Sequence, residues 1–201
     1  NYSGYGKAIY QKTNSGKTIV YAHLDKFSPI MERVLKLQQA KNKKYSVSTN
    51  FSPNEFRLKQ GDVIGSTGET GYAFGPNLHF EVRDESDAAL DPLSNGYLTT
   101  DKVTPIMHKI ALIPLSKGAL INSSPLMQTL PLFRNKNGVY LFADTVSVIG
   151  DFGLAIQAID KREGSKFKYQ FHKAELYIDN KLMFSLNYNR IPYNQTNNVR
   201  T

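Results

Sequence analysis

The sequence predicts a mainly β protein of two domains, with a single helix inserted in the first. Strand-length runs of β-branched, aromatic and alternating apolar residues recur along the 201-residue chain, and turn residues separate them. Only residues 28–44 carry apolar side chains at helical spacing. A stretch rich in loop residues, 90–105, divides the chain near its middle. We therefore predict one domain at residues 1–97 and a β-sandwich at residues 98–201.

The first domain begins with a predicted hairpin. Two β-rich runs, AIYQK and TIVYA, flank the turn signal NSG at residues 14–16. The helix follows, with Ser28 as the predicted N-cap and Pro29 as the first helical residue. Together these signals predict an antiparallel β-sheet into which one helix of about three to four turns is inserted.

Three further β features are predicted between the helix and the loop-rich stretch. Residues 45–49 (YSVST) alternate as a strand does. Residues 56–71 (FRLKQGDVIGSTGETG) predict a strand, a turn at residues 60–61, a second short strand and a Gly-rich bend. Residues 77–83 (NLHFEVR) alternate again after a Gly-Pro turn and predict one more strand.

The second half of the chain contains strand-length runs separated by turns. The runs are KIALIPL, GVYLFAD, SVIGDFGLAIQAID and KFKYQFHKAELYIDNKLMFSLNY. Asp179 and Asn180 form a predicted tight hairpin tip within the last of them. This spacing of strands predicts the β-sandwich.

Composition excludes several classes of site. The chain has no cysteine, so it has no disulfide, thiolate metal ligand or cysteine nucleophile. The net charge of +8 favours polyanionic neighbours in general, but the lysines are spread out except at residues 41–44, where the helix is expected to end. No aromatic and basic surface typical of nucleic-acid binding is visible, so we expect no nucleic-acid partner.

No apolar run reaches the length of a membrane span. The first residues are typical of the middle of a domain, which we interpret as a fragment or a mature form.

Asn77 and His79 form a pair whose meaning is ambiguous by itself. Residues two apart on a strand share a face, so their amide and imidazole should lie side by side. A histidine in such a place either satisfies a local hydrogen bond or belongs to a site. Glu81 and Arg83 continue the alternation, which predicts a solvated strand face or a pair bridging to a neighbouring strand.

Three spaced motifs occur in the first domain: GYGKAIYQKTNSGKTIVYAHLDKF, LKQGDVIGSTGETG and GPNLHFEVRD. In their order and their turn residues they resemble the lysostaphin/LytM-type zinc endopeptidases, which cut peptidoglycan cross-bridges. The resemblance covers most of residues 4–84, and the predicted helix lengthens the usual connection. It implies a LytM-type antiparallel β-sheet domain. The second half more distantly resembles immunoglobulin-like domains that follow such peptidases in some envelope proteins.

The resemblance implies roles for three residues. His23, in YAHL, matches the family's catalytic histidine that helps to orient or polarise water and the developing oxyanion, and His79 matches a zinc ligand. Asn77 stands where the family has the other histidine of H-L-H, which is expected to act as general base or transition-state donor. An asparagine amide can donate a hydrogen bond but cannot accept and return a proton near neutral pH. Loss of a positioned base typically lowers the rate by about 10²–10⁴-fold.

Zinc is the cofactor that the resemblance implies, and this chain lacks most of its ligands. The family takes two ligands from an H-x-x-x-D motif upstream of the Gly-Tyr-Gly strand, and no such motif occurs in the sequence. The other histidines, His108 and His172, have no aspartate four residues on and are expected to be ordinary residues of the second domain. Zinc is therefore expected only if a His and an Asp lie upstream of residue 1.

Two functions follow from this comparison. The first is a bacterial envelope protein, periplasmic or extracellular, that has lost most or all hydrolysis and binds peptidoglycan peptides or an envelope partner protein at His23, Asn77 and His79. The alternative is an active zinc endopeptidase whose missing ligands lie upstream. If nothing precedes residue 1, strands that the relatives use are missing, and the open edge of the sheet is expected to be completed by another chain or segment. A biotinyl or lipoyl carrier domain has similar Gly-Asp turns, but no exposed Met-Lys pair of the kind it needs is present.

Overall fold

The computed structural model describes residues 4–97 and 102–199 and is mainly β. Its contacts divide the chain into two compact units, which we describe separately. The first unit is Asn1–Leu98 together with Tyr188–Thr201, and the second is Thr99–Asn187. The C-terminal segment thus groups with the first unit, whereas the sequence placed residues 98–201 together. The domain limits of 1–97 and 98–201 stay a prediction.

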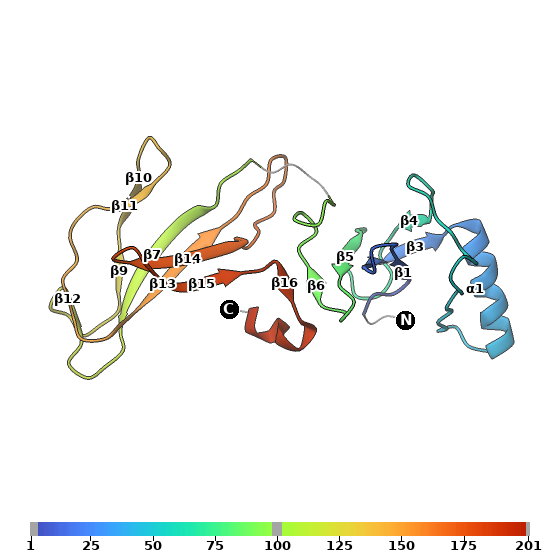
Figure 1. Cartoon of the computed structure of the whole chain (residues 1–201), viewed down its shortest axis with the longest axis horizontal. Helices are drawn as coiled ribbons and strands as arrows, with labels where there is room; N and C mark the ends of the chain where they lie inside the picture. The colour runs from blue at the N-terminus through green and yellow to red at the C-terminus, as the bar shows by residue number, and fades with distance from the viewer. Residues whose placement is uncertain (1–3, 98–101, 200–201) are drawn as a thin grey trace. The chain divides into compact units, whose positions relative to one another are not determined.

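An antiparallel sheet forms the centre of the first unit. Its strands are ordered β1 (Ile9–Lys12), β2 (Thr18–Ala22), β5 (His79–Arg83), β6 (Ala89–Leu90) and β16 (Arg190–Ile191). The Asn14-Ser15-Gly16 turn joins β1 to β2 as predicted, with Gly16 at φ +82°. The last strand, β16, comes from the C-terminal segment and extends the sheet beyond β6, as Figure 1 shows. Completion of the β1 edge by another chain stays a prediction.

Both faces of this sheet carry buried side chains. Ile19 and Val82 pair across β2 and β5 on one face and are 1% and 0% exposed. Val20 and Ala22 lie on the opposite face and are equally inaccessible. Burial of this kind contributes roughly 1.5–3 kcal/mol for each large apolar side chain. The strand that carries His79 is therefore held on a rigid support.

The predicted helix is present as α1 (Pro29–Asn42). Ser28 occupies the N-cap position, and the Glu32 carboxylate accepts a hydrogen bond of 3.0 Å from the backbone N–H of Phe27. At the other end, Lys43 adopts a left-handed conformation and closes the helix. No α1 residue is fully buried, so the helix lies on the surface as an insertion (Figure 1).

Two strand predictions in this unit are wrong. Residues 45–49 form no strand, because no neighbouring strand pairs with them and Tyr45 is 96% exposed. Residues 56–59 form none either, although the turn at residues 60–61 is present, with Gly61 at φ +95°. The short strand after the turn is correct, but β4 (Gly65–Thr67) pairs with β3 (Leu24–Phe27) instead of with residues 56–59.

The second unit consists of small antiparallel sheets (Figure 1). The largest places β7 (Ile106–Pro114) between β13 (Phe152–Ile159) and β9 (Gln128–Leu130). The remaining strands form two-stranded ladders: β8 (Leu120–Ile121) with β12 (Val148–Ile149), β10 (Leu132–Arg134) with β11 (Tyr140–Phe142), and β14 (Lys173–Ile178) with β15 (Lys181–Asn187). The predicted runs contain or overlap β7, β11, β12, β13, β14 and β15, but β8, β9 and β10 lie at residues 120–134, where no strand was predicted, and residues 166–172 form no strand. The arrangement of the strands as a sandwich stays a prediction.

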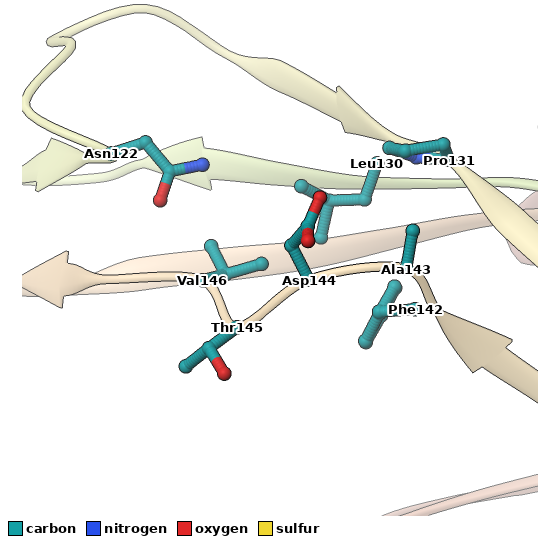
Figure 2. A pocket seen from close by; sticks show the side chains of 8 residues that line it. All are labelled: Asn122, Leu130, Pro131, Phe142, Ala143, Asp144, Thr145 and Val146. Carbon is teal, nitrogen blue, oxygen red and sulfur yellow. The ribbon is translucent and has the colours of Figure 1, made fainter.

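A small apolar cluster forms the core of this unit. Ile110, Leu112, Ile121 and Leu130 are its buried members. Beside it lies a cavity of about 90 Å³, and Figure 2 shows the side chains that line it: Asn122, Leu130, Pro131, Phe142, Ala143, Asp144, Thr145 and Val146. The lining mixes one carboxylate and one amide with apolar groups, and the cavity is too small for more than a few water molecules.

Candidate functional site

The candidate site lies on the face of the first unit's sheet that carries His79, Glu81 and Arg83. These side chains alternate along β5 and share a face with their cross-strand partners on β2: Ala22 lies opposite His79, and Val20 opposite Glu81. Val20 and Ala22 are apolar and fully buried, so the polar side chains of β5 lie next to apolar residues on the same face of the sheet. Contacts made in this setting are only partly screened by water.

His23 stands at the end of β2 in a left-handed conformation, with φ +60°, and is 8% exposed. Its Nδ1 lies 2.8 Å from the carbonyl oxygen of Thr70. Since a carbonyl can only accept, Nδ1 carries the proton, and the lone pair of the neutral ring lies on Nε2. The backbone N–H of His23 donates to the carbonyl of Tyr5 at 3.0 Å. The histidine is therefore fixed in both orientation and tautomer.

The Gly-Tyr-Gly segment holds the loop that His23 contacts. Tyr72 donates its backbone N–H to the carbonyl of Gly4 at 2.9 Å. A Cβ on Gly71 would lie 2.4 Å from the backbone nitrogen of Gly6, so the two segments meet at a distance that only glycine permits. This close approach places the Thr70 carbonyl beside the imidazole of His23 and explains why both segments are rich in glycine.

His79 and His23 lie next to each other. Their ring centroids are 5.6 Å apart in an edge-to-face arrangement, and the Tyr5 ring lies 5.0 Å from His79 on another side. The Nε2 of His79 is hydrogen-bonded to Oε1 of Glu81. Because a carboxylate can only accept, Nε2 is the protonated nitrogen. The His79 side chain stays 38% exposed, so the site is open to solvent.

Glu81 is the centre of a dense hydrogen-bond network. Its Oε1 accepts from the Tyr5 hydroxyl at 2.6 Å and from His79, and its Oε2 accepts from Nε of Arg83 at 2.7 Å and from the Tyr193 hydroxyl. Burial raises the pKa of Glu81, but these hydrogen bonds outweigh burial and lower the pKa to about 2. The carboxylate is therefore charged throughout the physiological range.

Arg83 balances this charge. Its guanidinium donates to Glu81 and to the Asp87 carboxylate at 3.1 Å, and its Cζ lies 4.7 Å from the ring centre of Tyr193. Burial lowers the pKa of Arg83, but the hydrogen bonds to the two carboxylates raise it by more. The pKa of Arg83 therefore lies above its ordinary value. Arg83 and Glu81 are only 8% and 12% exposed. Of the two alternatives predicted for Glu81 and Arg83, the solvated strand face is wrong, because aromatic rings cover the pair. The two side chains pair with each other within β5.

Asn77 does not join the two histidines through its side chain. Its amide nitrogen donates to the carbonyl of Gly75 at 3.1 Å, and its backbone N–H donates to the carbonyl of Gly68 at 2.9 Å. The residue is exposed at the rim of the site. Its amide therefore supports the Gly-Pro turn, and nothing in this geometry provides a proton acceptor at the position.

The described residues do not fit a catalytic zinc ion by themselves. Zinc requires three protein ligands and an open position. Within residues 4–97 and 102–199, no three His, Asp or Glu side chains gather in a way that could hold a metal. Glu81, the carboxylate nearest to His79, is already engaged by Arg83 and tyrosine hydroxyls. His108, in β7, and His172, before β14, belong to the second unit.

Two members of the network escaped the sequence analysis. The sequence assigns no role to Tyr5, whose hydroxyl binds Glu81. Tyr193 stands 112 positions from Glu81, and no local pattern marks it. The YNQT sequence around Tyr193 gives no sign that this segment returns to the first unit.

Comparison with known proteins relates part of the chain to a bacterial peptidase. The chain is 31% identical over 80 residues to the DD-carboxypeptidase/endopeptidase Mpg of Neisseria meningitidis serogroup B (strain ATCC BAA-335 / MC58). The alignment covers 40% of this chain and 13% of that protein. No family model and no solved structure matches the chain. Among the described residues, no helix is both long enough and apolar enough to cross a membrane.

Proposed function

We propose that this chain is part of a bacterial envelope protein related to the LytM-type endopeptidases, and that its first unit binds peptidoglycan peptides with hydrolysis lost or strongly impaired. The observation that carries the proposal is the contact between the His23 and His79 rings, together with Asn77 two residues before His79, whose amide binds the Gly75 carbonyl and cannot act as a base. The motif resemblance and the 31% identity to a DD-carboxypeptidase/endopeptidase support it. The proposal includes a periplasmic or extracellular location, which follows from the same relationship.

The chemistry of the site favours binding over turnover. The Nε2 lone pair of His23 can accept a hydrogen bond from a peptide amide, and the exposed Asn77 can donate to or accept from a peptide backbone. The Nε2 proton of His79 is already donated to Glu81. A ligand amide can thus be held between His23 and the rim, while the Asn77 amide cannot take a proton from water and return it as an imidazole at that position would.

The alternative is a zinc endopeptidase that is completed by ligands outside these residues. Two observations favour it: His23 keeps a defined tautomer, and His79 remains 38% exposed. In that protein His79 would be one ligand, and the metal would polarise the scissile carbonyl and activate water. A His and an Asp upstream of residue 1 are required, and Asn77 predicts slow turnover even then.

The second unit is proposed to be an immunoglobulin-like sandwich that spaces or docks the first. Its antiparallel ladders and apolar cluster support this assignment. The tight tip at Asp179 and Asn180, with φ of +50° and +61°, is the kind of turn that joins neighbouring strands in such domains. The expected ligand, a peptidoglycan peptide or an envelope partner protein, would bind to the first unit.

Titration with defined cross-linked peptidoglycan peptides, followed by NMR, tests the proposal. We expect specific shifts around His23 and Asn77, and about tenfold weaker binding in His23→Ala, which loses a hydrogen bond in a partly buried site. His108→Ala, a change at an exposed side chain of β7 in the second unit, is the matched control and should bind as the wild type does.

Turnover is measured on the same peptides with added zinc. No turnover by this chain, together with binding, supports the impaired binder. Turnover that a chelator abolishes supports the alternative, and restoration by a longer chain carrying an upstream His and Asp would do the same. Absence of both binding and turnover in every form sinks the proposal.

A further inference from the structure

The C-terminal segment, residues 188–199, is anchored on the first unit at several polar points. Its strand β16 pairs with β6, with Arg190 opposite Leu90 and Ile191 opposite Ala89. The Arg190 guanidinium donates to Oδ2 of Asp84 at 2.7 Å and to the Ser86 hydroxyl at 2.7 Å. These contacts place Tyr193, two residues after the strand, next to Glu81 and Arg83 of β5.

Tyr193 contacts both members of the buried ion pair. Its hydroxyl donates to Oε2 of Glu81, and its ring lies 4.7 Å from Cζ of Arg83. Beside it is a groove of about 340 Å³ lined by Ser86, Asp87, Ala88, Pro192, Tyr193 and Asn194. The ring borders this groove and stays 40% exposed.

The carboxylate of Glu81 in turn orients His79. Each oxygen accepts two donors, so the torsion of the carboxylate is set by contacts on both sides. Without the Tyr193 hydroxyl, Oε2 keeps only Arg83, and three donors hold the carboxylate instead of four. The imidazole of His79 is 38% exposed and lies against the Tyr5 ring, so the Glu81 hydrogen bond is what fixes its orientation.

We propose that Tyr193 is a positioning residue: the C-terminal segment completes the candidate site by fixing the Glu81 carboxylate and, through it, the imidazole of His79. The use of that imidazole for peptide binding rests on the proposed function, whereas the positioning itself does not. A segment that follows the whole second unit is thereby a structural part of the site in the first.

Tyr193→Phe tests this directly, because it removes one hydroxyl and keeps the ring on Arg83. Tyr10→Phe is the matched control: the Tyr10 ring also stacks on Arg83, at 5.6 Å, and among the contacts of the described residues none involves its hydroxyl. Both variants are compared at one fixed neutral pH by imidazole NMR. The signals followed are the ring resonances of His79 and the exchange rate of its Nε2 proton.

In Tyr193→Phe we expect the His79 ring signals to shift and the Nε2 proton to exchange about tenfold faster, because the Glu81 carboxylate that accepts this proton loses one hydrogen bond from another donor. The ring of His108 and the amide of Val20 should not move, and Tyr10→Phe should match the wild type. A His79 ring that responds identically in the two variants overturns the proposal.

If Tyr193→Phe also disturbs the Val20 amide, Arg190→Gln decides the question. That variant loosens the anchor at Asp84 without touching Glu81. A His79 shift with an undisturbed Val20 amide supports the positioning role, and an unchanged His79 overturns it. Peptide titration of the same samples separates the two proposals: a responsive His79 in a protein that binds no peptide leaves the positioning role intact and removes the proposed function.

Discussion

Replacing Glu81 by glutamine should destabilise the first unit by about 3 kcal/mol at neutral pH. Burial raises the pKa of Glu81, but hydrogen bonds from Arg83, Tyr193 and other donors lower it from 4.5 to about 2. At about 1.4 kcal/mol for each pKa unit, the charged carboxylate contributes about 3 kcal/mol to folding. Its side chain is 12% exposed, so solvent screening removes little of this. Glutamine would also leave the Arg83 charge buried without its main partner.

The stabilisation by Glu81 should depend on pH. The pKa of Glu81 is lower in the folded than in the unfolded protein, so its contribution is fully present above about pH 4.5 and is lost as the pH falls toward 2. In Glu81→Gln this component is absent. The stability difference between wild type and variant should therefore shrink over that window. Asp84, whose pKa hydrogen bonds from Ser86 and Arg190 lower to about 2, titrates in both proteins and cancels in the difference.

Urea denaturation at several pH values, followed by the NMR signals of a β5 amide and a β7 amide, measures the effect in each unit. Val82 reports on the first unit, and Ile110 is the internal reference in the second. Glu175→Gln is the matched control, because it removes an exposed carboxylate that pairs with Lys173 at 2.7 Å and should change neither signal. A constant gap between wild type and Glu81→Gln from pH 7 to the acid limit would refute the argument, since the charge would then not be its source.

Three further changes test the fold. Ile19→Ala, at a side chain 1% exposed, should cost about 3 kcal/mol in urea denaturation of the first unit, and a loss of under about 1 kcal/mol would contradict the packing described. Gly71→Ala should lower the melting temperature more than Gly75→Ala, because both have positive φ but only the first would place a Cβ 2.4 Å from Gly6; equal losses would show that backbone conformation alone matters. Asn180→Gly should stabilise the β14–β15 hairpin by about 0.5 kcal/mol, because its φ of +61° suits glycine, and lower stability would argue against the turn.

Turns and helix ends could be predicted from the sequence because their causes are local. Asn14-Ser15-Gly16 forms a hairpin, Pro29 begins the helix, and Asp179 with Asn180 forms a tight tip. In each case the deciding factor is a backbone conformation that a few neighbouring residue types favour. The same holds for the general class, since strand-length runs between turns predict a mainly β chain.

Alternation without a partner misled the prediction at residues 45–49. A strand is stable only where another strand accepts its hydrogen bonds and a neighbouring surface buries one face. The chain places Tyr45 in solvent and pairs β3 with β4, so the pattern has no ladder to join. Which strands meet is a long-range property, and a period-2 pattern does not contain it.

The sequence by itself determined the residue types at the candidate site, His23, Asn77 and His79, and the alternation that puts His79 and Glu81 on one face of a strand. Only the tertiary structure decided what these groups contact. It brought the Tyr193 hydroxyl to Glu81 from 112 positions away and buried Arg83 between aromatic rings. The physical reason is that the spacing of side chains along one strand is set locally, whereas a buried charge takes its partners from whichever segments fold back to cover it.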